Sequence, residues 1–381
     1  MNNQLIYRIA LTMINGIGPK LARRLLNEVG DAESIFSEKQ SMLERVPGIG
    51  RTLAAEIKNA EVLKRAEREA AFAGKNNISC RFITDDDYPF RLRQCEDAPV
   101  ILYSRGECDL NALRIISIVG TRRPTDYGRS LTGKLVAELA AVYPDMVIVS
   151  GLAYGIDITA HRNAIKNQLP TVAVLAHGLD RVYPFEHSST ASEMLEYGGA
   201  CVTEFPSGTN PDKINFVRRN RIIAGLSDAT VVVESSERGG SLITAEMAFS
   251  YDREVFAFPG RATDIHSHGC NRIISQDQAA LIMCANDLIL AMRWDTGVTL
   301  QKESQPVTQS KPRKPVQTEL VFTVEDDPFH ILSLLQKNGS MHINQISAEV
   351  NIPVSKLSGM LLDMEMDKKL QAVPGSAYKL V

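Results

Sequence analysis

Short apolar runs alternate with helical patterns along the central part of the chain, between residues 115 and 262. The runs are rich in Ile and Val and end at turns of glycine or polar residues, which is typical of buried parallel strands. The strands predicted in this way span residues 115–119, 146–150, 171–176, 200–203, 229–234 and 254–258. Strand–helix alternation at this spacing predicts an α/β fold with a doubly wound, Rossmann-like parallel sheet. Ligands of such sheets bind beyond the carboxyl ends of the strands.

Before this region, residues 1–74 have the pattern of an all-helical domain. Two of its segments, 14–22 and 46–54, resemble each other: each has a Gly-x-Gly turn followed by a basic residue and an apolar helix. This is the helix-hairpin-helix signature of SAM-like domains. The glycines allow a phosphate to approach the backbone, and the next helix offers unpaired N–H groups. Two roles stay open for this domain: phosphate contact, or a small packing or protein-contact module.

Three further segments complete the predicted domain organisation. Residues 75–110 are a connecting extension that we expect to pack on the edge of the sheet, so that the Rossmann-like domain spans residues 75–293. Residues 294–324, rich in Gln, Ser, Thr, Lys and Pro, predict a flexible linker. Residues 325–381 have three helical patterns and then a hairpin, which is the order of a winged-helix domain. Its presumed recognition helix mixes acidic and basic residues, which favours protein contact or regulation over DNA reading.

Composition limits the classes of partner. The net charge of -3 gives no overall basic signal, so nucleic-acid binding would need a local basic patch. A hydrophobic content of 44% in 381 residues is that of a globular protein with two or three domains. Six cysteines without a Cys-x-x-Cys pair indicate reduced thiols. Arg8 interrupts the first apolar stretch and no apolar run reaches membrane-spanning length, so we expect a cytoplasmic protein that binds no membrane.

The turn after the first strand is the first candidate for ligand binding. Gly120, Thr121 and Arg122 follow that strand directly. A guanidinium group at this place can bind phosphate oxygens in a bidentate way or stack on a base. The alternative is that Arg122 only fixes the loop by bonding to Asp126 or Asp157.

The turn after the second strand carries Gly151 and Gly155. It lacks the full Gly-x-Gly-x-x-Gly fingerprint, and no suitably placed acidic residue marks a ribose site, so a dinucleotide is disfavoured and no cofactor is expected. The backbone N–H groups of this turn can still hold a phosphate. Asp157 fits the N-cap of the following helix.

The densest basic cluster lies between the fourth and fifth predicted strands. Its residues are Lys213, Arg218, Arg219 and Arg221, and Asn220 between them can also reach a ligand. Together with Arg122 they predict a groove that follows the phosphates of a nucleic-acid strand. The alternative is that one or two of these arginines are buried structural anchors. Tyr154, Phe216 and Tyr183 are candidates for base stacking or for the core.

A third turn, which contains Gly240 and Ser241, is a further candidate for anion binding. Glu246 lies on the helix that follows. This arrangement supplies an alternative function: a Rossmann-like nucleotide-processing enzyme resembling nucleoside monophosphate glycosidases, with Arg122 on the phosphate and Glu246 as the acid/base. No convincing second catalytic group accompanies Glu246.

Metal-ligand residue types occur together at His266, His268 and Cys270. Their spacing is short, and zinc sites usually recruit a fourth ligand that this region does not offer. No Ser/His/Asp set emerges elsewhere. We therefore expect neither a metal site nor an enzyme.

Several of these turns resemble one known family in their residues, order and spacing. The segments are Val119-Gly120-Thr121-Arg122, residues 150–157, Thr203-Glu204-Phe205-Pro206, residues 219–226 and residues 240–245. They resemble the DprA/Smf family (DNA processing protein A, DNA-protecting protein). The resemblance implies a protein of natural transformation and homologous recombination that binds and protects incoming single-stranded DNA and loads the RecA recombinase. It also implies a homodimer formed through the Rossmann-like domain. The sequence alone locates neither the dimer surface nor the RecA surface.

Overall fold

The computed structural model describes residues 3–294 and parts of residues 331–380. The chain divides into two compact units, residues 1–302 and 303–381. In the second unit the described residues are 331–332, 334–336, 339–350, 352, 357, 360–361, 364–365, 369–373 and 377–380. The predicted linker, residues 294–324, lies outside the described residues except for Trp294. Among the described residues, no helix is both long enough and apolar enough to cross a membrane.

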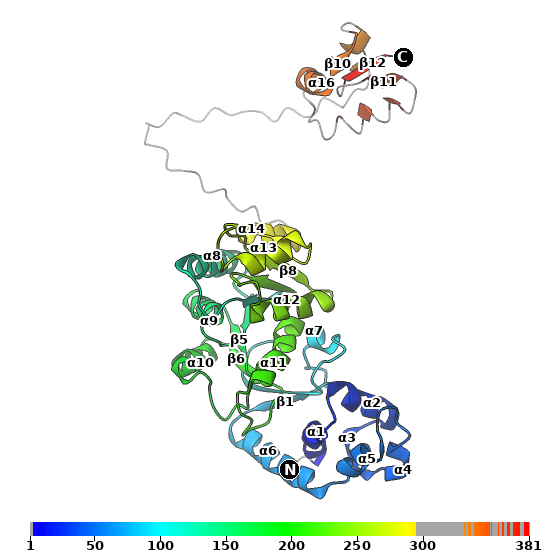
Figure 1. The fold of residues 1–381 in the computed structure, drawn as a ribbon, viewed down its shortest axis with the longest axis vertical. Coiled ribbons are helices and arrows are strands. Elements are labelled where there is room, and N and C mark those ends of the chain that lie inside the picture. The colour runs from blue at the N-terminus through cyan, green and yellow to red at the C-terminus, as the bar shows by residue number, and fades with distance from the viewer. Residues whose placement is uncertain are drawn as a thin grey trace, which may run out of the picture. The chain divides into compact units, whose positions relative to one another are not determined.

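The first unit begins with an all-helical domain, as predicted (Figure 1, blue). Its helices are α1 (Asn3–Met13), α2 (Pro19–Val29), α3 (Ala32–Ser37), α4 (Gln40–Leu43), α5 (Arg51–Ile57) and α6 (Ala60–Lys75). The long helix α6 packs along α1, and their apolar faces enclose a core with Leu25, Ile35 and Ile57. Since α6 ends at Lys75, the helical domain ends close to the predicted boundary at residue 74.

The two predicted helix-hairpin-helix turns have nearly the same backbone. Gly16 and Gly48 have φ values of 81° and 87°, which favour glycine, and each begins a turn that leads into α2 or α5. Each turn packs against a leucine of the other hairpin: Leu53 lies over Gly16, and Leu21 lies over Gly48. The two hairpins therefore stabilise each other, which explains the repeated sequence by packing. Phosphate contact by these turns stays a prediction.

Polar contacts bind the helical domain to the rest of the first unit. The buried carboxylate of Glu69 on α6 accepts hydrogen bonds from Ser207 N (2.9 Å) and Ser207 Oγ (2.5 Å). Arg23 donates to the carbonyl oxygen of Cys95 at 2.6 Å, and Arg8 pairs with Asp85 at 2.9 Å. The first contact holds the loop after β6 against the helical domain, and the other two hold the connecting extension against it.

A nine-stranded sheet forms the centre of the first unit. Its strands are β1 (Ser79–Phe82), β2 (Ile101–Gly106), β3 (Ile115–Val119), β4 (Val147–Ser150), β5 (Thr171–Val174), β6 (Ala200–Thr203), β7 (Ala229–Val232), β8 (Glu254–Ala257) and β9 (Ala280–Leu281). They lie in the order β1-β2-β6-β5-β4-β3-β7-β8-β9, and every neighbouring pair from β6 to β9 is parallel. Strands β3 to β8 confirm the six predicted strands. Fully buried positions along β3 and β4 explain their unbroken apolar pattern.

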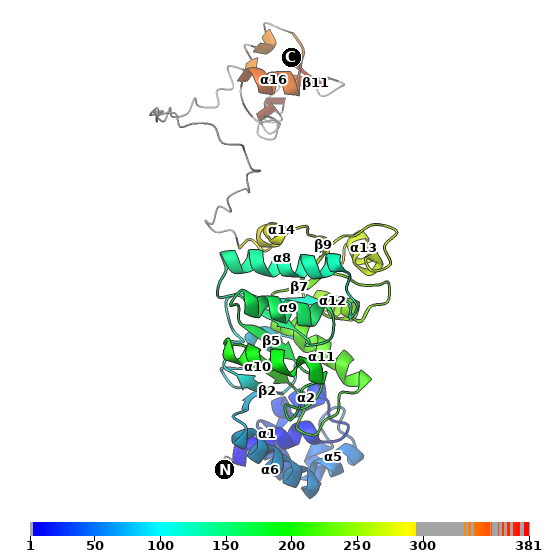
Figure 2. The ribbon, with the colours of Figure 1, turned by 90° about the vertical axis from the view of Figure 1, so that its left-hand side faces the viewer.

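Helices cover both faces of this sheet (Figures 1 and 2). One face carries α8 (Asp126–Val142), α9 (Ile156–Lys166) and, after the short 3-10 helix η1 (Phe185–His187), α10 (Ser188–Glu196); the other carries α7 (Phe90–Arg93), α11 (Lys213–Leu226) and α12 (Gly240–Ser250). Helices α13 (His268–Ser275) and α14 (Ala285–Ala291) lie near β8 and β9. The chain builds β4 and β5 on one side of β3, and β7 and β8 on the other. The strand order thus reverses between β3 and β7, which is where such sheets bind ligands.

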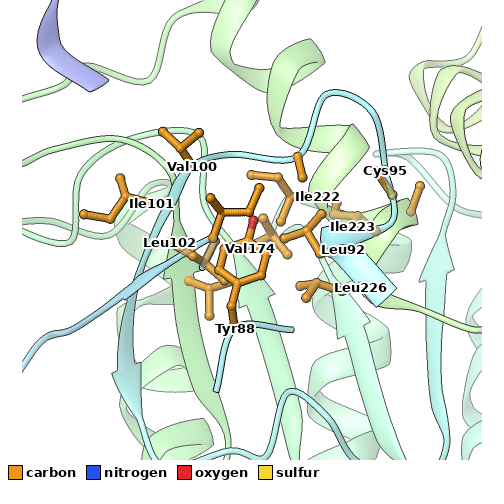
Figure 3. Packing of buried hydrophobic residues seen from close by; sticks show 14 of the residues in the cluster. Tyr88, Leu92, Cys95, Val100, Ile101, Leu102, Val174, Ile222, Ile223 and Leu226 are labelled. Atoms are coloured by element: carbon orange, nitrogen blue, oxygen red, sulfur yellow. The ribbon is translucent and has the colours of Figure 1, made fainter. Parts of the chain in front are cut away.

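The connecting extension contributes more than an edge contact. Strands β1 and β2 pair antiparallel with each other, and β2 pairs antiparallel with β6, so the extension adds an antiparallel edge to the predicted parallel sheet. Figure 3 shows the apolar side chains of this segment, among them Tyr88 and Leu92, packed against Ile222 and Leu226 of α11. The extension is therefore part of the central core.

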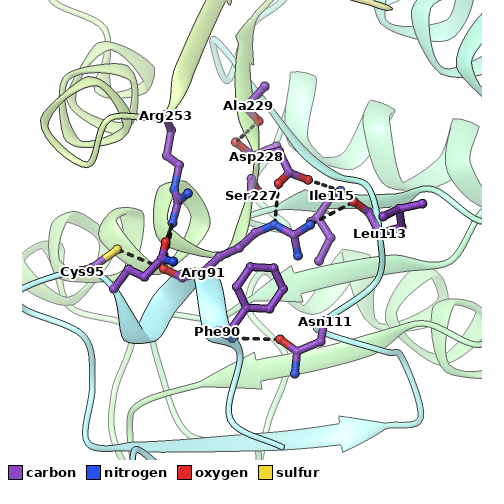
Figure 4. A network of polar contacts seen from close by, with 12 residues as sticks. Phe90, Arg91, Cys95, Asn111, Leu113, Ile115, Ser227, Asp228, Ala229 and Arg253 are labelled. Carbon is purple, nitrogen blue, oxygen red and sulfur yellow. Dashed lines mark hydrogen bonds and ion pairs between the residues drawn. The ribbon is translucent and has the colours of Figure 1, made fainter. Parts of the chain in front are cut away.

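A polar network joins the same extension to β3 and β7, the two strands between which the strand order reverses (Figure 4). Arg91 Nε donates to Asp228 Oδ1 at 2.6 Å, and Asp228 Oδ2 accepts from Ile115 N at 2.8 Å. Arg253 donates to the carbonyl oxygen of Arg91 at 2.9 Å. The network joins α7 to the first residue of β3 and to the residue before β7. A fragment of the central domain must therefore include the extension to retain this packing.

His161 is buried on α9 and contacts β5 through a hydrogen bond. Thr171 Oγ1 donates to the carbonyl oxygen of Ile148 at 2.8 Å, so it must accept from His161 Nδ1 at 2.7 Å. His161 Nε2 is buried without a hydrogen-bond partner in the described part of the chain. Burial lowers the pKa of His161 from 6.5 to about 3, and the positive charges of His187 and Arg219 act in the same direction. His161 is therefore a neutral packing residue.

Acid is expected to destabilise the first unit through His161. Between pH 6.5 and 3 the unfolded chain binds a proton at this residue and the folded chain does not, so stability falls as the pH falls through that window. At pH 5 the loss is about 2 kcal/mol, from 1.36 kcal/mol per pKa unit. Urea unfolding of wild type and His161→Gln at pH 7 and pH 5 measures it. The wild type should lose about 2 kcal/mol more than the variant between the two pH values; equal losses would contradict the assignment.

The second unit has the winged-helix order that the sequence predicts. Residues 331–332 and 334–336 are helical; they are followed by β10 (Met341–His342), α16 (Ile343–Val350), the helical residues 357, 360–361 and 364–365, and the hairpin β11 (Leu370–Val373) and β12 (Ala377–Leu380). Strand β12 pairs with both β10 and β11. Most charged residues of the presumed recognition helix lie outside the described residues, so its preference for protein contact stays a prediction.

Candidate functional site

A cavity of about 470 Å³ lies beyond the carboxyl ends of β3 and β7, at the point where the strand order reverses. The turn after β3 forms one wall, and the first turns of α11 and α12 form the others. Of the predicted site residues, those that line it are Gly120, Thr121, Arg122, Lys213, Arg219, Asn220, Gly240 and Ser241. The structure thus brings together three turns that are far apart in the sequence, at the edge where the strand pattern predicts a ligand.

The turn after β3 is held in place by Glu234 and by the start of α9. Thr121 N donates to the carbonyl oxygen of Glu234 at 2.8 Å, and Thr125 donates to the Glu234 carboxylate from its N (2.9 Å) and its Oγ1 (2.5 Å). Ile156 N donates to the carbonyl oxygen of Thr121 at 3.2 Å. Because both ends of the turn are fixed, the backbone of Arg122 has a defined place on the cavity wall.

The Arg122 side chain is exposed and faces the cavity. Its Cζ lies 5.4 Å from the ring centroid of Phe216, which is a cation–π distance. Within the described part of the chain, its guanidinium group makes no hydrogen bond or ion pair with Asp126 or Asp157. The structure therefore contradicts the alternative that Arg122 only fixes the loop by bonding to one of these carboxylates.

The basic cluster of α11 divides between two environments. Lys213 and Asn220 line the cavity. Arg221 points away from it: its guanidinium group is buried, pairs with Glu204 at 2.5 Å and donates to the carbonyl oxygen of Asp97. Arg218 also turns toward Glu204, at 3.8 Å, with its side chain 48% exposed. The prediction of one groove built from the whole cluster is wrong for Arg221, because Glu204 holds its buried guanidinium group away from the cavity. Contact of the exposed Arg218 with a strand stays a prediction.

Arg219 forms the floor of the cavity and is only 4% exposed. Its Nη1 donates to the carbonyl oxygens of Gly151 (2.6 Å) and Val174. Burial lowers the pKa of Arg219 to about 10, against the opposing effect of the Asp157 carboxylate. Arg219 is thus the buried anchor that the sequence left as an alternative, and it adds positive charge below the cavity.

Asp157 does not occupy the predicted N-cap position. Helix α9 begins at Ile156 with Gly155 as its N-cap, so Asp157 lies in the first turn. Its buried carboxylate accepts a hydrogen bond from Ala153 N at 3.4 Å. Burial raises the pKa of Asp157, and the positive charge of Arg219 opposes that rise. Asp157 therefore acts as a partial counter-charge to Arg219 on the cavity floor.

The two glycines of the second turn support the cavity without lining it. Gly151 offers its carbonyl oxygen to Arg219, whose guanidinium group leaves no room for a side chain there. Gly155 lies against the backbone of Thr121 and Arg122, where a side chain would collide. These glycines therefore allow the close approach of neighbouring elements, and their predicted contact with phosphate is not seen in the cavity wall.

Two helix N-termini open into the cavity. Lys213 is the first residue of α11, and Gly240 and Ser241 are the first residues of α12. Unpaired N–H groups and the helix dipole make such N-termini favourable places for an anion. Ser241 Oγ donates to Ser235 Oγ at 3.0 Å, which orients the first turn of α12. The cavity therefore combines helix N-termini with cationic side chains.

Sequence reasoning missed the apolar part of the cavity wall. Val217, Ile223 and Ile243 line it, and Val217 and Ile243 are partly exposed although they lie on helices. Apolar residues at helical spacing predict core contacts, so no sequence signal could show that two of them face this cavity. Phe216, named as a candidate for stacking, does line the cavity, and so does Tyr183.

The acidic groups near the cavity either lie outside its wall or are hydrogen-bonded within the protein. Glu246, the acid of the alternative enzyme, is exposed on α12 and is not part of the cavity wall. The carboxylate of Glu234 is occupied by Thr125. Among the described residues, no group of three or more His, Cys, Asp or Glu is placed to hold a metal ion. His268 instead contacts the carbonyl oxygen of Ala262 at 3.2 Å.

Comparisons with known proteins agree with this architecture. The family model described as DNA recombination-mediator protein A matches residues 79–293, that of the SAM-like helix-hairpin-helix tandem matches residues 9–60, and that of the DprA winged helix domain matches residues 311–376. Protein Smf of Synechocystis sp. is 30% identical and is matched over 99% of both chains. DNA processing protein DprA of Bacillus subtilis is 38% identical over 60% of this chain and 77% of its own length.

Two solved structures resemble this chain in fold. The X-ray structure of DNA processing protein A from Streptococcus pneumoniae superposes with a TM-score of 0.61 at 32% identity, over 76% of this chain and 98% of that chain. The structure of DNA processing protein A from Helicobacter pylori was described for its single-stranded DNA binding mode. It superposes with a TM-score of 0.51 at 30% identity, over 57% of this chain and 96% of that chain. With a family model spanning more than half of the chain and a relative matched along almost all of it, the chain belongs to the DprA/Smf family of DNA recombination-mediator proteins.

Proposed function

We propose that the chain binds single-stranded DNA in the cavity beyond the carboxyl ends of β3 and β7. The observation that carries the proposal is the composition of the cavity wall. Three cationic side chains, Arg122, Lys213 and Arg219, and two helix N-termini meet there, and Asp157 is the one acidic residue in that wall. Single-strand sites combine positive charge along the phosphates with aromatic rings that stack on bases, and Phe216 supplies such a ring.

Each part of the cavity has a distinct task in this proposal. Arg122 and Lys213 are exposed and contact phosphate oxygens, while the N–H groups of Gly240 and Ser241 donate hydrogen bonds to a further phosphate oxygen. Phe216, under the guanidinium group of Arg122, offers a face to one base. None of these contacts reads a base edge, so binding is expected to be independent of sequence.

Relatives support this assignment. The Helicobacter pylori relative was described for its single-stranded DNA binding mode, and the relatives from Bacillus subtilis and Streptococcus pneumoniae are named DNA processing proteins. We extend the proposal to what the family resemblance implies: protection of incoming single strands and loading of the RecA recombinase in transformation and recombination. The proposed protein acts in the cytoplasm as a homodimer formed through the Rossmann-like domain.

The proposal treats the chain as a binding protein without turnover. A glycosidase needs an acid/base placed at the reacting bond. Glu246 lies off the cavity wall, and Asp157 is buried against Ala153. Asp157 is the one acid in the cavity wall, and it is buried and hydrogen-bonded, so the competing enzyme function lacks an exposed acid there.

The central domain alone, residues 75–293, is expected to bind fluorescent oligothymidylate nearly as well as the full chain. The cavity lies within it, and the fragment keeps the extension that packs on α11. Anisotropy titrations of the fragment, the full chain and a chain ending at residue 294 measure this. Removal of the winged-helix domain should cost less than tenfold in affinity, about 1.4 kcal/mol.

Nucleoside monophosphates are incubated with the same preparation and followed for release of free base. A folded fragment without oligonucleotide affinity would refute the cavity assignment. Turnover of nucleotides, abolished by Arg122→Ala, would favour the enzyme instead.

A further inference from the structure

Three aromatic rings are exposed next to the cavity and are not needed for the core. Tyr154 is 45% exposed, Tyr183 is 47% exposed and Phe185 is 81% exposed. We name these residues the aromatic ledge. Single exposed apolar residues are common on protein surfaces, but a contiguous group at a ligand site indicates contact with something else.

The ledge is continuous with the cavity. Tyr183 lines the cavity, and its ring centroid lies 5.8 Å from that of Phe216. Tyr154 directly follows Ala153, which also lines the cavity. The hydroxyl group of Tyr154 donates to Glu186 Oε2 at 3.1 Å, which places Tyr154 beside the helix η1 that begins at Phe185.

Polar and ring contacts support the ledge at Tyr154 and Tyr183. His187 Nδ1 donates to the carbonyl oxygen of Leu152 at 2.8 Å, and its ring meets that of Tyr154 at 4.9 Å with an interplanar angle of 68°. His177 Nε2 accepts a hydrogen bond from the backbone N of Tyr183 at 3.2 Å. Rings whose position is supported before binding lose less conformational freedom on contact with a ligand, so these contacts favour affinity.

The chemistry of the ledge differs from that of the cavity. The cavity wall carries Arg122, Lys213 and Arg219, whereas the ledge itself is uncharged and its Tyr154 donates to the exposed Glu186 beside Phe185. A carboxylate there disfavours a phosphate but not a neutral base. The ledge is therefore suited to planar, uncharged rings that extend from a ligand anchored by its phosphates in the cavity.

We infer that the aromatic ledge is a second subsite for single-stranded DNA, on which bases that follow the cavity-bound nucleotides stack. The inference rests on the proposed function. A cavity of about 470 Å³ is of small-molecule size, so a longer strand must continue over the surface. The ledge adjoins the cavity and offers aromatic faces, which bind every base through its π-face.

Phe185→Ala in the full chain tests the subsite. Stacking of one base is worth about 1–3 kcal/mol, so affinity for long oligothymidylates is expected to fall about five- to hundredfold. Affinity for oligomers too short to leave the cavity should not change. The dependence of affinity on salt should also stay the same, because no phosphate contact is lost. Phe185→Trp should restore binding, and Phe249→Ala, an exposed ring on α12 outside the cavity wall, should match the wild type.

A series of oligomers that each carry a single 2-aminopurine locates the contact. Quenching at one position should disappear in Phe185→Ala and return in Phe185→Trp. Wild-type affinity of Phe185→Ala for every length, with Arg122→Ala still weakened, would overturn the ledge and leave the proposed function standing. Failure of the wild type to bind any oligomer would overturn both. A change in self-association of Phe185→Ala by light scattering, with unchanged oligonucleotide affinity, would assign the ledge to protein contact and overturn the subsite.

Discussion

Arg219→Met is expected to lower the free energy of unfolding of the first unit by about 3–5 kcal/mol. The variant keeps most of the side-chain volume but leaves the carbonyl oxygens of Gly151 and Val174 without their donor. It also leaves the buried Asp157 carboxylate without the cation that lowers its pKa. Removing one partner from such a buried arrangement exposes the full desolvation cost of the other.

Urea unfolding followed by Trp294 fluorescence measures this effect. Trp294 is the only tryptophan of the chain, and it packs edge-on against Tyr143 of the first unit. The matched control is Arg218→Met, an exposed neighbour 3.8 Å from its partner, for which less than about 1 kcal/mol is expected. A loss no larger than that of the control would show that Arg219 is not the anchor of the cavity floor.

A double-mutant cycle with Asp157→Asn separates the charge from the hydrogen bonds. With Arg219 absent, the pKa of Asp157 rises further, so the folded state binds a proton more readily than the unfolded state. Relative to the wild type, the stability of Arg219→Met should then recover partly as the pH falls through that pKa. Adding Asp157→Asn should remove this recovery and make the two substitutions non-additive.

The sheet is the part of the fold that the sequence predicts best. Strands β3 to β7 are buried at every position, so each appears as a largely apolar run that no exposed helix or loop would carry. The mixed edge was not predictable in the same way. Strand β1 contains Arg81 and β2 contains Arg105, and nothing in their local pattern sets the direction of pairing. That direction depends on packing of the extension against α11.

The sequence predicts where the cavity lies, but it predicts only some of the side chains that line it. Glycines and Arg122 directly after β3 mark a ligand turn because the fold fixes where that turn lies. The arginines of α11 share one sequence cluster, and their division depends on groups elsewhere in the chain. Glu204 lies at the end of β6 and draws Arg221 away, while carbonyl oxygens after β4 and at the end of β5 receive Arg219. The local sequence of α11 does not show which of these distant groups each arginine will contact.

Arg122→Ala is expected to weaken binding of single-stranded DNA without unfolding the protein. The side chain is exposed on a turn whose backbone is held by Glu234 and Ile156, so truncation opens no core cavity. Loss of one phosphate contact should lower the logarithmic salt slope by about 0.7. Loss of stacking alone should instead cost about 1–3 kcal/mol with the slope unchanged. Because Arg122 lies over Phe216 and faces the cavity, we expect both a lower slope and a lower affinity.

The measurement is a salt titration of fluorescent oligothymidylate binding beside a urea melt. Arg123→Ala is the matched control: Arg123 is exposed on the same turn but is not part of the cavity wall. If the two variants weaken binding equally, the total charge of the turn matters and the position of Arg122 does not. If Arg122→Ala lowers the urea midpoint and leaves affinity unchanged, Arg122 is structural after all. A loss of affinity and slope confined to Arg122→Ala, with an unchanged midpoint, would place this guanidinium group on the strand.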